Sequence, residues 1–178
     1  QQITKTRFID HRTNHMFMRL DCKDDQYGKC NLEEVDYQGY DAIVLSDYNK
    51  GFLSERTISE IGSNHDCVFL DTKKRLGDWC KGVTFIKINE QEYQRNKDYI
   101  VGNIDDKIIT TLGRHGASYG GLTYSVPEVE IKDVAGAGDS FIAGLIVDYI
   151  ATKDINSAIA FANKCATEVV QKRGISTP

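Results

Sequence analysis

A short glycine-rich segment followed by an acidic residue is the part of the sequence best suited to chemistry. Gly136, Ala137 and Gly138 carry almost no side chain and precede an apolar stretch that begins at Phe141. Small residues at the start of a helix let several backbone N–H groups converge on one anion. Asp139 stands at the same helix start, where its carboxylate could take a proton from a hydroxyl beside that anion. Phosphoryl transfer to an alcohol requires this combination.

Each of these residues also has a plainer interpretation. Gly136 and Gly138 could form only a tight turn, with Asp139 capping the helix. Asn89 and Glu92 lie three residues apart after an apolar strand, so an amide and a carboxylate could approach a hydrated Mg²⁺. The same pair could form an ordinary capping box. Residue types alone leave both alternatives open.

Three basic residues near predicted strand ends are further candidates for binding an anion. Lys50 and Lys73 follow strands, where phosphates could lie, but either could be an ordinary surface lysine. Arg19, at the end of an early strand, could meet an anionic sugar phosphate or a neighbouring carboxylate. In open α/β sheets, binding sites lie outside the carboxyl ends of the strands. We therefore expect a site at the ends of these strands.

Apolar strands alternating with helices predict a mainly parallel sheet covered on both faces, in one α/β domain. The expected strands are 3–9, 16–20, 42–46, 67–70, 83–88, 107–112, 117–119 and 122–126. The expected helices are 54–61, 138–150 and 155–171, with a polar helical turn from Asn89. Segment 3–20 is expected to form a hairpin, and Gly120-Gly121 a second hairpin turn.

The composition narrows the possible partners. Hydrophobic residues make up 40% of the 178, enough for one core, and the net charge of −4 comes without a basic run, which disfavours nucleic acid. The longest apolar stretch, 141–147, is too short for a bilayer, which takes ~20 residues. Five irregularly spaced cysteines without a C-x-x-C pair argue against a disulfide framework and favour the cytoplasm. We expect a small-molecule partner and no membrane.

Four segments, in chain order, resemble the PfkB family of ribokinase-like carbohydrate kinases. The segment D-V-A-G-A-G-D-S-F at 133–141 resembles the family signature D-T-x-G-A-G-D-x-F, with Val134 in place of the usual Thr. N-E-Q-E at 89–92 resembles the N-x-x-E motif, T-L-G-R-H-G at 111–116 the T-x-G-x-x-G nucleotide loop, and F-A-N at 161–163 the helix beside the adenine.

The resemblance implies a ribokinase-like three-layer α/β/α sandwich that uses ATP and Mg²⁺, and it allows a monovalent cation. It implies that Asp139 is the catalytic base and that 136–138 stabilise the transferred phosphoryl group. It implies that Asn89 and Glu92 hold Mg²⁺ through water. The implied cofactor-binding residues are Asn89, Glu92, Thr111, Gly113, Gly116, Asn163 and Lys73; from residue types alone, the glycines could also form a plain loop.

Within the family, the chain is most similar to the kinases of heptose 7-phosphate, which act in ADP-heptose synthesis. S-D-Y-N-K-G at 46–51 resembles their S-D-Y-x-K-G, and F-M-R-L-D at 17–21 resembles their segment ending I-R-L-D. D-T-K at 71–73 replaces their D-P-K, and K-R-G-I-S-T at 172–177 resembles their K-x-G-T-S-T. The resemblance implies that the sugar phosphate is bound by Arg19, Asp47, Lys50 and Asp139.

The sequence also departs from the family. It begins at Gln1 without the early strands, the glycine-rich sugar motif and part of the lid, and it has no H-x-G-H nucleotidyltransferase signature. We therefore expect residues 1–178 to form the C-terminal, nucleotide-binding portion of one N-terminally truncated domain. Open sheet edges favour a homo-oligomer or association with the missing segment. A nucleotide-binding remnant or assembly module without turnover stays an alternative, whereas the absence of G-x-G-x-x-G disfavours a dinucleotide oxidoreductase.

Overall fold

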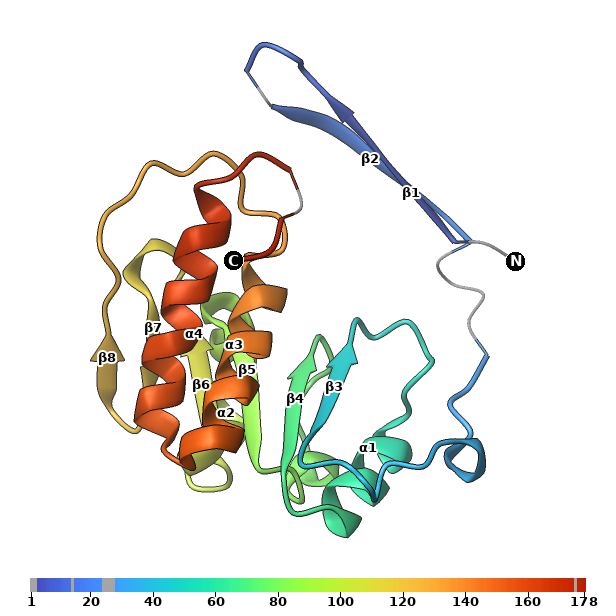
Figure 1. The fold of residues 1–178 in the computed structure, drawn as a ribbon. Coiled ribbons are helices and arrows are strands. Elements are labelled where there is room, and N and C mark those ends of the chain that lie inside the picture. Colours follow the sequence, from blue (N-terminus) through green and yellow to red (C-terminus); the bar gives the residue numbers. More distant parts are fainter. Residues whose placement is uncertain (1–2, 14, 24–27, 175) are drawn as a thin grey trace.

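The chain forms an antiparallel ribbon beside a layered α/β body (Figure 1). The structure is a computed structural model that describes residues 3–13, 15–23, 28–174 and 176–178. Ile175, part of the 172–177 resemblance, lies outside the described residues. The ribbon consists of β1 (Thr4–Ile9) and β2 (Met16–Cys22), which pair with Arg7 opposite Arg19. The predicted hairpin is confirmed, and it stands apart from the main sheet.

The main sheet has six strands in the order β3-β4-β5-β6-β7-β8. The first four pair in parallel, and the last two are antiparallel. The carboxyl ends of the parallel strands therefore lie along one edge. The strands are β3 (Ile43–Asp47), β4 (Val68–Thr72), β5 (Phe85–Asn89), β6 (Ile108–Thr111), β7 (Ala117–Tyr119) and β8 (Leu122–Tyr124).

Four helices cover the sheet, and local capping explains where they begin. Ser54 accepts a hydrogen bond from the amide of Thr57, and Asp154 from the amide of Asn156, as expected of N-cap residues. The helices are α1 (Glu55–Asn64), α2 (Glu90–Ile100), α3 (Ala137–Thr152) and α4 (Ile155–Val170). None of the described helices is long and apolar enough to cross a membrane.

Most expected elements shift by one to three residues at an end, and two of the differences shape the pockets. The polar turn expected at Asn89 is a helix of 11 residues, because a capping box starts α2 and Asn96 in its second half is buried and bonded. The last strand ends at Tyr124 rather than at 126, and the chain then runs to α3 without regular structure. This irregular segment becomes part of a pocket wall.

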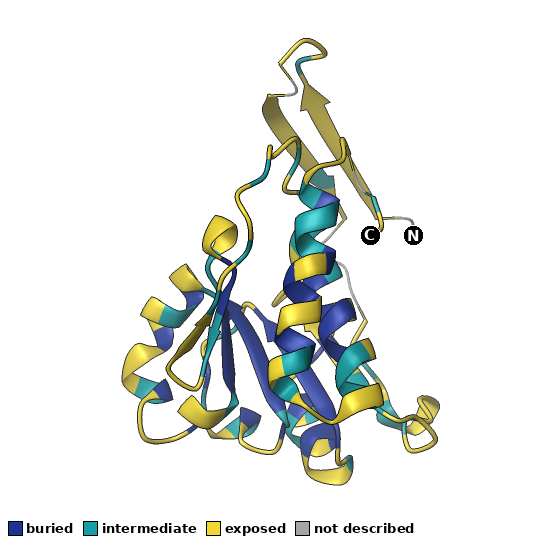
Figure 2. Ribbon diagram, turned by 60° about the vertical axis from the view of Figure 1, so that its left-hand side comes forward, coloured by how far each residue is buried: buried dark blue, intermediate teal, exposed yellow. Residues whose placement is uncertain are grey.

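The alternation of side chains along the strands creates one core on each face of the sheet. Leu70 in β4 packs with Ile58 of α1 and belongs to one cluster, which α2 completes. Phe69, the neighbouring residue, points the other way and packs in the cluster with Leu145 of α3 and Ile159 of α4. The central strands β4, β5 and β6 are buried on both sides, as the dark blue strands of Figure 2 show. The predicted three-layer, mainly parallel α/β/α arrangement is confirmed.

The packing of α3 on α4 depends on a glycine. A Cβ added at Gly144 would lie 2.9 Å from the Sγ of Cys165 and 3.3 Å from the Cα of Ala162. Real side chains essentially never pack that closely, so the two helices can approach only with glycine there. Since α3 carries the glycine-rich segment at its first turn, this contact also fixes the place of that turn.

We expect Gly144→Val to lower the free energy of unfolding by about 1–3 kcal/mol, because the added methyl groups overpack the helix interface. Gly39→Val is the matched control: a Cβ at Gly39 meets nothing within 4 Å, and its backbone is outside the left-handed region. The control should stay within about 0.5 kcal/mol of the wild type in urea denaturation. Equal losses in both variants would contradict this account of the interface.

Candidate active site

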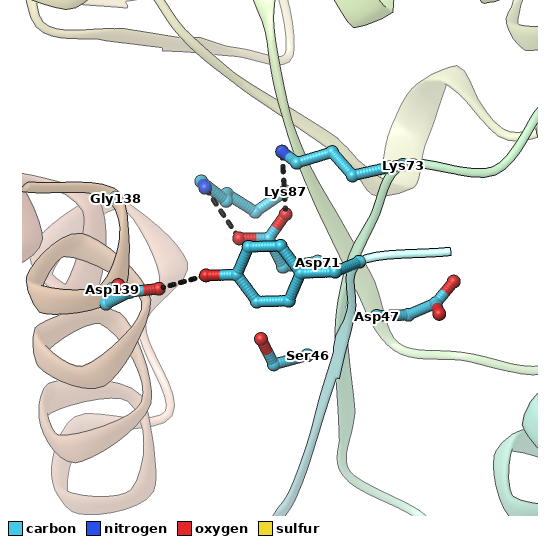
Figure 3. Close-up of a pocket in the computed structure, with 8 residues that line it drawn as sticks. Ser46, Asp47, Asp71, Lys73, Lys87, Gly138 and Asp139 are labelled. Atoms are coloured by element: carbon cyan, nitrogen blue, oxygen red, sulfur yellow. Dashed lines mark hydrogen bonds and ion pairs between the residues drawn. The ribbon is translucent and has the colours of Figure 1, made fainter. Parts of the chain in front are cut away.

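A polar pocket of about 200 Å³ opens where the carboxyl ends of β3, β4 and β5 face the start of α3 (Figure 3). Parallel strands bring polar residues from three chain segments to this edge. The lining residues are Ser46, Asp47, Tyr48, Asp71, Lys73, Lys87, Gly138 and Asp139. The pocket thus joins the glycine-rich segment to the strand ends that the sequence singled out.

The first turn of α3 leaves its backbone amides unobstructed. Gly136 is the N-cap residue with φ +84°, a left-handed conformation that favours glycine, and no side chain caps the helix. The first helical bond runs from the amide of Ser140 to the carbonyl of Gly136, over 2.8 Å. The amide of Ala137 donates to the carbonyl of Val134 at 3.3 Å, so an anion would meet the amides of Gly138 and Asp139, where the helix dipole favours a negative charge. An anion can bind here, as the small residues indicated.

Asp139 does not cap its own helix. Its Oδ1 accepts a hydrogen bond from the hydroxyl of Tyr48 at 3.2 Å, and Figure 3 shows its carboxylate pointing from α3 toward the strands. Burial, together with the negative charge of Asp139, raises the pKa of Tyr48. The Tyr48 hydroxyl therefore stays protonated near neutral pH and acts as the donor. The capping interpretation of Asp139 is wrong in this structure.

A buried ion pair lies behind the start of α3. The Nζ of Lys87 bonds to the Oδ2 of Asp71 at 2.7 Å, and both residues are less than a tenth exposed. The same Nζ lies 3.2 Å from where a Cβ at Gly138 would be, so the ammonium group reaches the first turn of α3. The sequence pattern assigned a site role to neither residue, although Asp71 belongs to the D-T-K segment. A lysine in the apolar segment 83–88 and an aspartate directly after the apolar segment 67–70 were the available signals.

Lys73 connects this pair to the predicted metal motif. Its Nζ lies 2.6 Å from the Oε1 of Glu92 and 3.7 Å from the Oδ1 of Asp71. Burial lowers the pKa of Lys73, but the hydrogen bond to Glu92 and the two carboxylates outweigh it and raise the pKa. Lys73 therefore carries a positive charge at the pocket.

The predicted metal motif forms the capping box that was its alternative interpretation. The Oδ1 of Asn89 accepts from the amide of Glu92 at 2.9 Å, and the Oε2 of Glu92 accepts from the amide of Asn89 at 2.8 Å. Glu92 is buried. The described residues contain no group of three or more His, Cys, Asp or Glu side chains that could hold a metal ion directly.

The four residues predicted to bind the sugar phosphate are not all in the pocket. Asp47 and Asp139 line it, but Arg19 and Lys50 do not. The carboxylate of Asp47 is buried and bonded to Thr72 at 2.7 Å and Lys74 at 2.8 Å, so it anchors the strand ends. Arg19 pairs with Asp21 on the ribbon, which is the neighbouring-carboxylate alternative.

A second, larger pocket of about 750 Å³ lies on the other side of the start of α3. It brings together Thr111, Gly113, Gly116 and Asn163, which belong to the separate motifs at 111–116 and 161–163. Its remaining walls are mostly apolar and include the irregular segment before α3. The apolar lining residues are Val126, Pro127, Val129, Ile131, Val134, Ala137, Phe141, Ala166 and Val170. An apolar cleft with a few polar groups suits a flat ring system.

Gly116 and Asn163 build the polar wall of this large pocket. Gly116 has φ +87°, and a Cβ on it would lie 2.0 Å from the carbonyl oxygen of Tyr124, so only glycine fits. The Nδ2 of Asn163 donates to the same carbonyl at 2.7 Å. Asn163 thus holds β8 in place beside the pocket.

The two pockets meet at Gly138, which lines both. A ligand with its ring in the large pocket can therefore lay an anionic tail over the first amides of α3. The end of that tail would lie beside Lys87 and Asp139. The geometry suits transfer of an anionic group from such a ligand to an acceptor in the polar pocket.

Comparison with known proteins agrees with this geometry. The model of the pfkB family carbohydrate kinases matches residues 4–178. The bifunctional protein HldE of Nitratiruptor sp. is 32% identical over 157 residues, which is 78% of this chain and 34% of that protein. The HldE of Bradyrhizobium diazoefficiens is 28% identical over 96% of this chain and 41% of its own length. The chain thus spans about a third to two-fifths of these curated relatives.

Solved structures show the same fold. A ribokinase from Thermotoga maritima superposes with a TM-score of 0.70 at 17% identity, over 96% of this chain and 63% of that one. A sugar kinase from Pyrococcus horikoshii, solved in complex with ATP, has a TM-score of 0.64 at 18% identity, over 96% and 66%. The fold is ribokinase-like, and the chain belongs to the pfkB family of carbohydrate kinases.

Proposed function

We propose that the chain binds ATP in the large pocket and transfers the γ-phosphoryl group to a hydroxyl of a sugar phosphate in the polar pocket. The observation that carries this proposal is the meeting of the two pockets at Gly138, next to Asp139. The acceptor favoured by the sequence is the C1 hydroxyl of heptose 7-phosphate, in ADP-heptose synthesis for lipopolysaccharide precursors. Its support is the S-D-Y-N-K-G segment and the similarity to HldE proteins.

In the proposed reaction, Asp139 acts as the general base. The acceptor oxygen forms a bond to the γ-phosphorus, the bond to the bridging oxygen of ADP breaks, and the acceptor proton moves to the Asp139 carboxylate. The small residues 136–138 and the ammonium group of Lys87 lie beside the place where negative charge would develop, although the amide of Ala137 already donates to the carbonyl of Val134. Their fixed dipoles and charge stabilise the transferred group without reorganising.

Magnesium is part of the proposal and would neutralise charge on the phosphates. Both carboxylate oxygens of Glu92 already have partners, so Asn89 and Glu92 fit a hydrated ion held through water better than direct coordination. The Oδ1 of Asp71 is buried without a hydrogen-bond partner, and a water of that ion would satisfy it. A monovalent cation belongs to the proposal through the family resemblance.

One observation favours a second function, nucleotide binding without turnover. Arg19 and Lys50, two of the proposed sugar-phosphate ligands, lie outside the polar pocket, whereas Thr111, Gly113, Gly116 and Asn163, four of the proposed nucleotide ligands, all line the large pocket. Such a chain would bind ATP but hold the acceptor too loosely, and positioning can contribute about 7–11 kcal/mol to this kind of transfer. A test for turnover separates the two functions.

The proposal also covers the cellular location of the chain and its association with other polypeptide segments. A cytoplasmic location is supported by the five irregularly spaced cysteines, which are all free thiols in the structure. A homo-oligomer, or association with a further N-terminal segment, is supported by the position of β3 at the edge of the described sheet.

We expect Asp139→Asn to lower ATP turnover with heptose 7-phosphate by about 10²- to 10⁴-fold, because the general base is lost. Binding of a non-hydrolysable ATP analogue, measured by calorimetry, should change little. Asp148→Asn, in the last turns of the same helix, is the matched control and should keep full turnover. The assay includes a panel of other sugars, and an unchanged rate in Asp139→Asn would refute the assignment.

We expect Ala166→Phe to weaken binding of the ATP analogue by about tenfold or more, because the ring would fill the large pocket that Ala166 lines. Ala160→Phe adds the same ring to an exposed position of α4 and should bind normally. Thermal denaturation of both variants controls for folding. Equal affinities in the two variants would place the nucleotide elsewhere.

A further inference from the structure

Asp139 has one hydrogen-bond donor on the far side of the polar pocket. The hydroxyl of Tyr48, just after β3, lies 3.2 Å from Asp139 Oδ1. The other charged groups that line this pocket have different partners: Lys87 bonds to Asp71, and Lys73 to Glu92. Among the described residues, Tyr48 is therefore the side chain that holds the carboxylate of Asp139.

The position of Asp139 in α3 explains why it needs to be held. It is the third residue after the N-cap Gly136, and from this position a carboxylate commonly turns back to the free amides of its own helix. Gly136 has no side chain to occupy those amides. A carboxylate that turned back would neutralise the anion site and face away from an acceptor hydroxyl.

We propose that Tyr48 is a positioning residue that keeps the Asp139 carboxylate directed into the polar pocket and away from the first amides of α3. The inference rests on the proposed function, in which the Asp139 carboxylate takes the proton of the acceptor hydroxyl. At 3.2 Å the bond is longer than the usual charge-assisted O–H···O⁻ contact of 2.5–2.7 Å. The bond is therefore weak enough for an acceptor hydroxyl to compete with it.

Tyr48 is itself fixed from two sides. The buried carboxylate of Asp47, its neighbour, accepts from the amide of Asn49 at 3.0 Å and so closes the turn around Tyr48. From the ribbon, the Nζ of Lys5 lies 5.5 Å from the centre of the Tyr48 ring, within range of a cation–π contact. The ribbon thus contacts the residue that positions the base.

Tyr48→Phe tests the proposal, because it keeps the ring and its contact with Lys5 and removes only the hydroxyl. Without that donor, Asp139 should turn toward the amides and compete with the γ-phosphate. We expect affinity for a non-hydrolysable ATP analogue to fall about fivefold relative to affinity for ADP, the size of a typical net hydrogen-bond contribution. The amide resonances of 136–139 in ¹⁵N NMR spectra should also shift. Tyr40→Phe, an exposed tyrosine outside both of these pockets, is the matched control.

The same measurements in an Asp139→Ala background decide between positioning and a direct role of Tyr48. If Tyr48 acts through Asp139, Tyr48→Phe should have no effect there. An equal effect in both backgrounds, or no effect in the wild-type background, overturns the proposal. If neither nucleotide binds, the proposed function fails, and the amide resonances in the two backgrounds alone decide about Tyr48.

Discussion

The unobstructed start of α3 is the constraint on which the rest of the site depends. A helix N-terminus attracts an anion only if no side chain fills it, and here a left-handed Gly136 and the small Gly138 keep it open. Both pockets need that opening, since Gly138 lines each of them. The buried contact at Gly144 fixes the helix, so the opening stays beside the strand ends.

The buried ion pair of Asp71 and Lys87 lies behind this opening, and its burial affects stability. Asp71 and Lys87 are removed from water within the sheet, and a buried ion pair is often no more stabilising than apolar residues of similar size. Stability therefore does not explain why the pair is present. The position of the Lys87 ammonium group at the start of α3 explains it better, because the proposed anionic ligand would lie there and need a nearby positive charge.

The sequence predicts the elements and the large pocket better than the polar one. Hydrophobic alternation and N-caps such as Ser54 locate most strands and helices, since these signals are local. Thr111, Gly116 and Asn163 line one pocket, and the motifs that contain them can be found in the sequence. The roles of Tyr48 and Lys87 could not be predicted, since their partners are distant in the chain and come close only after the sheet has formed.

Arg19 lies outside the polar pocket and pairs with Asp21, two residues away in the same strand. The hydrogen bond from Arg19 lowers the pKa of Asp21, and the positive charges of Lys5 and Lys50 lower it further, so three cations share one carboxylate at the ribbon base. Exposed ion pairs of this kind contribute little to stability and exchange partners readily. In the proposed function, the phosphate group of the acceptor would compete with Asp21 for these cations. The ribbon thus carries a cluster of positive charge close to Tyr48, since the Nζ of Lys5 lies 5.5 Å from the centre of that ring.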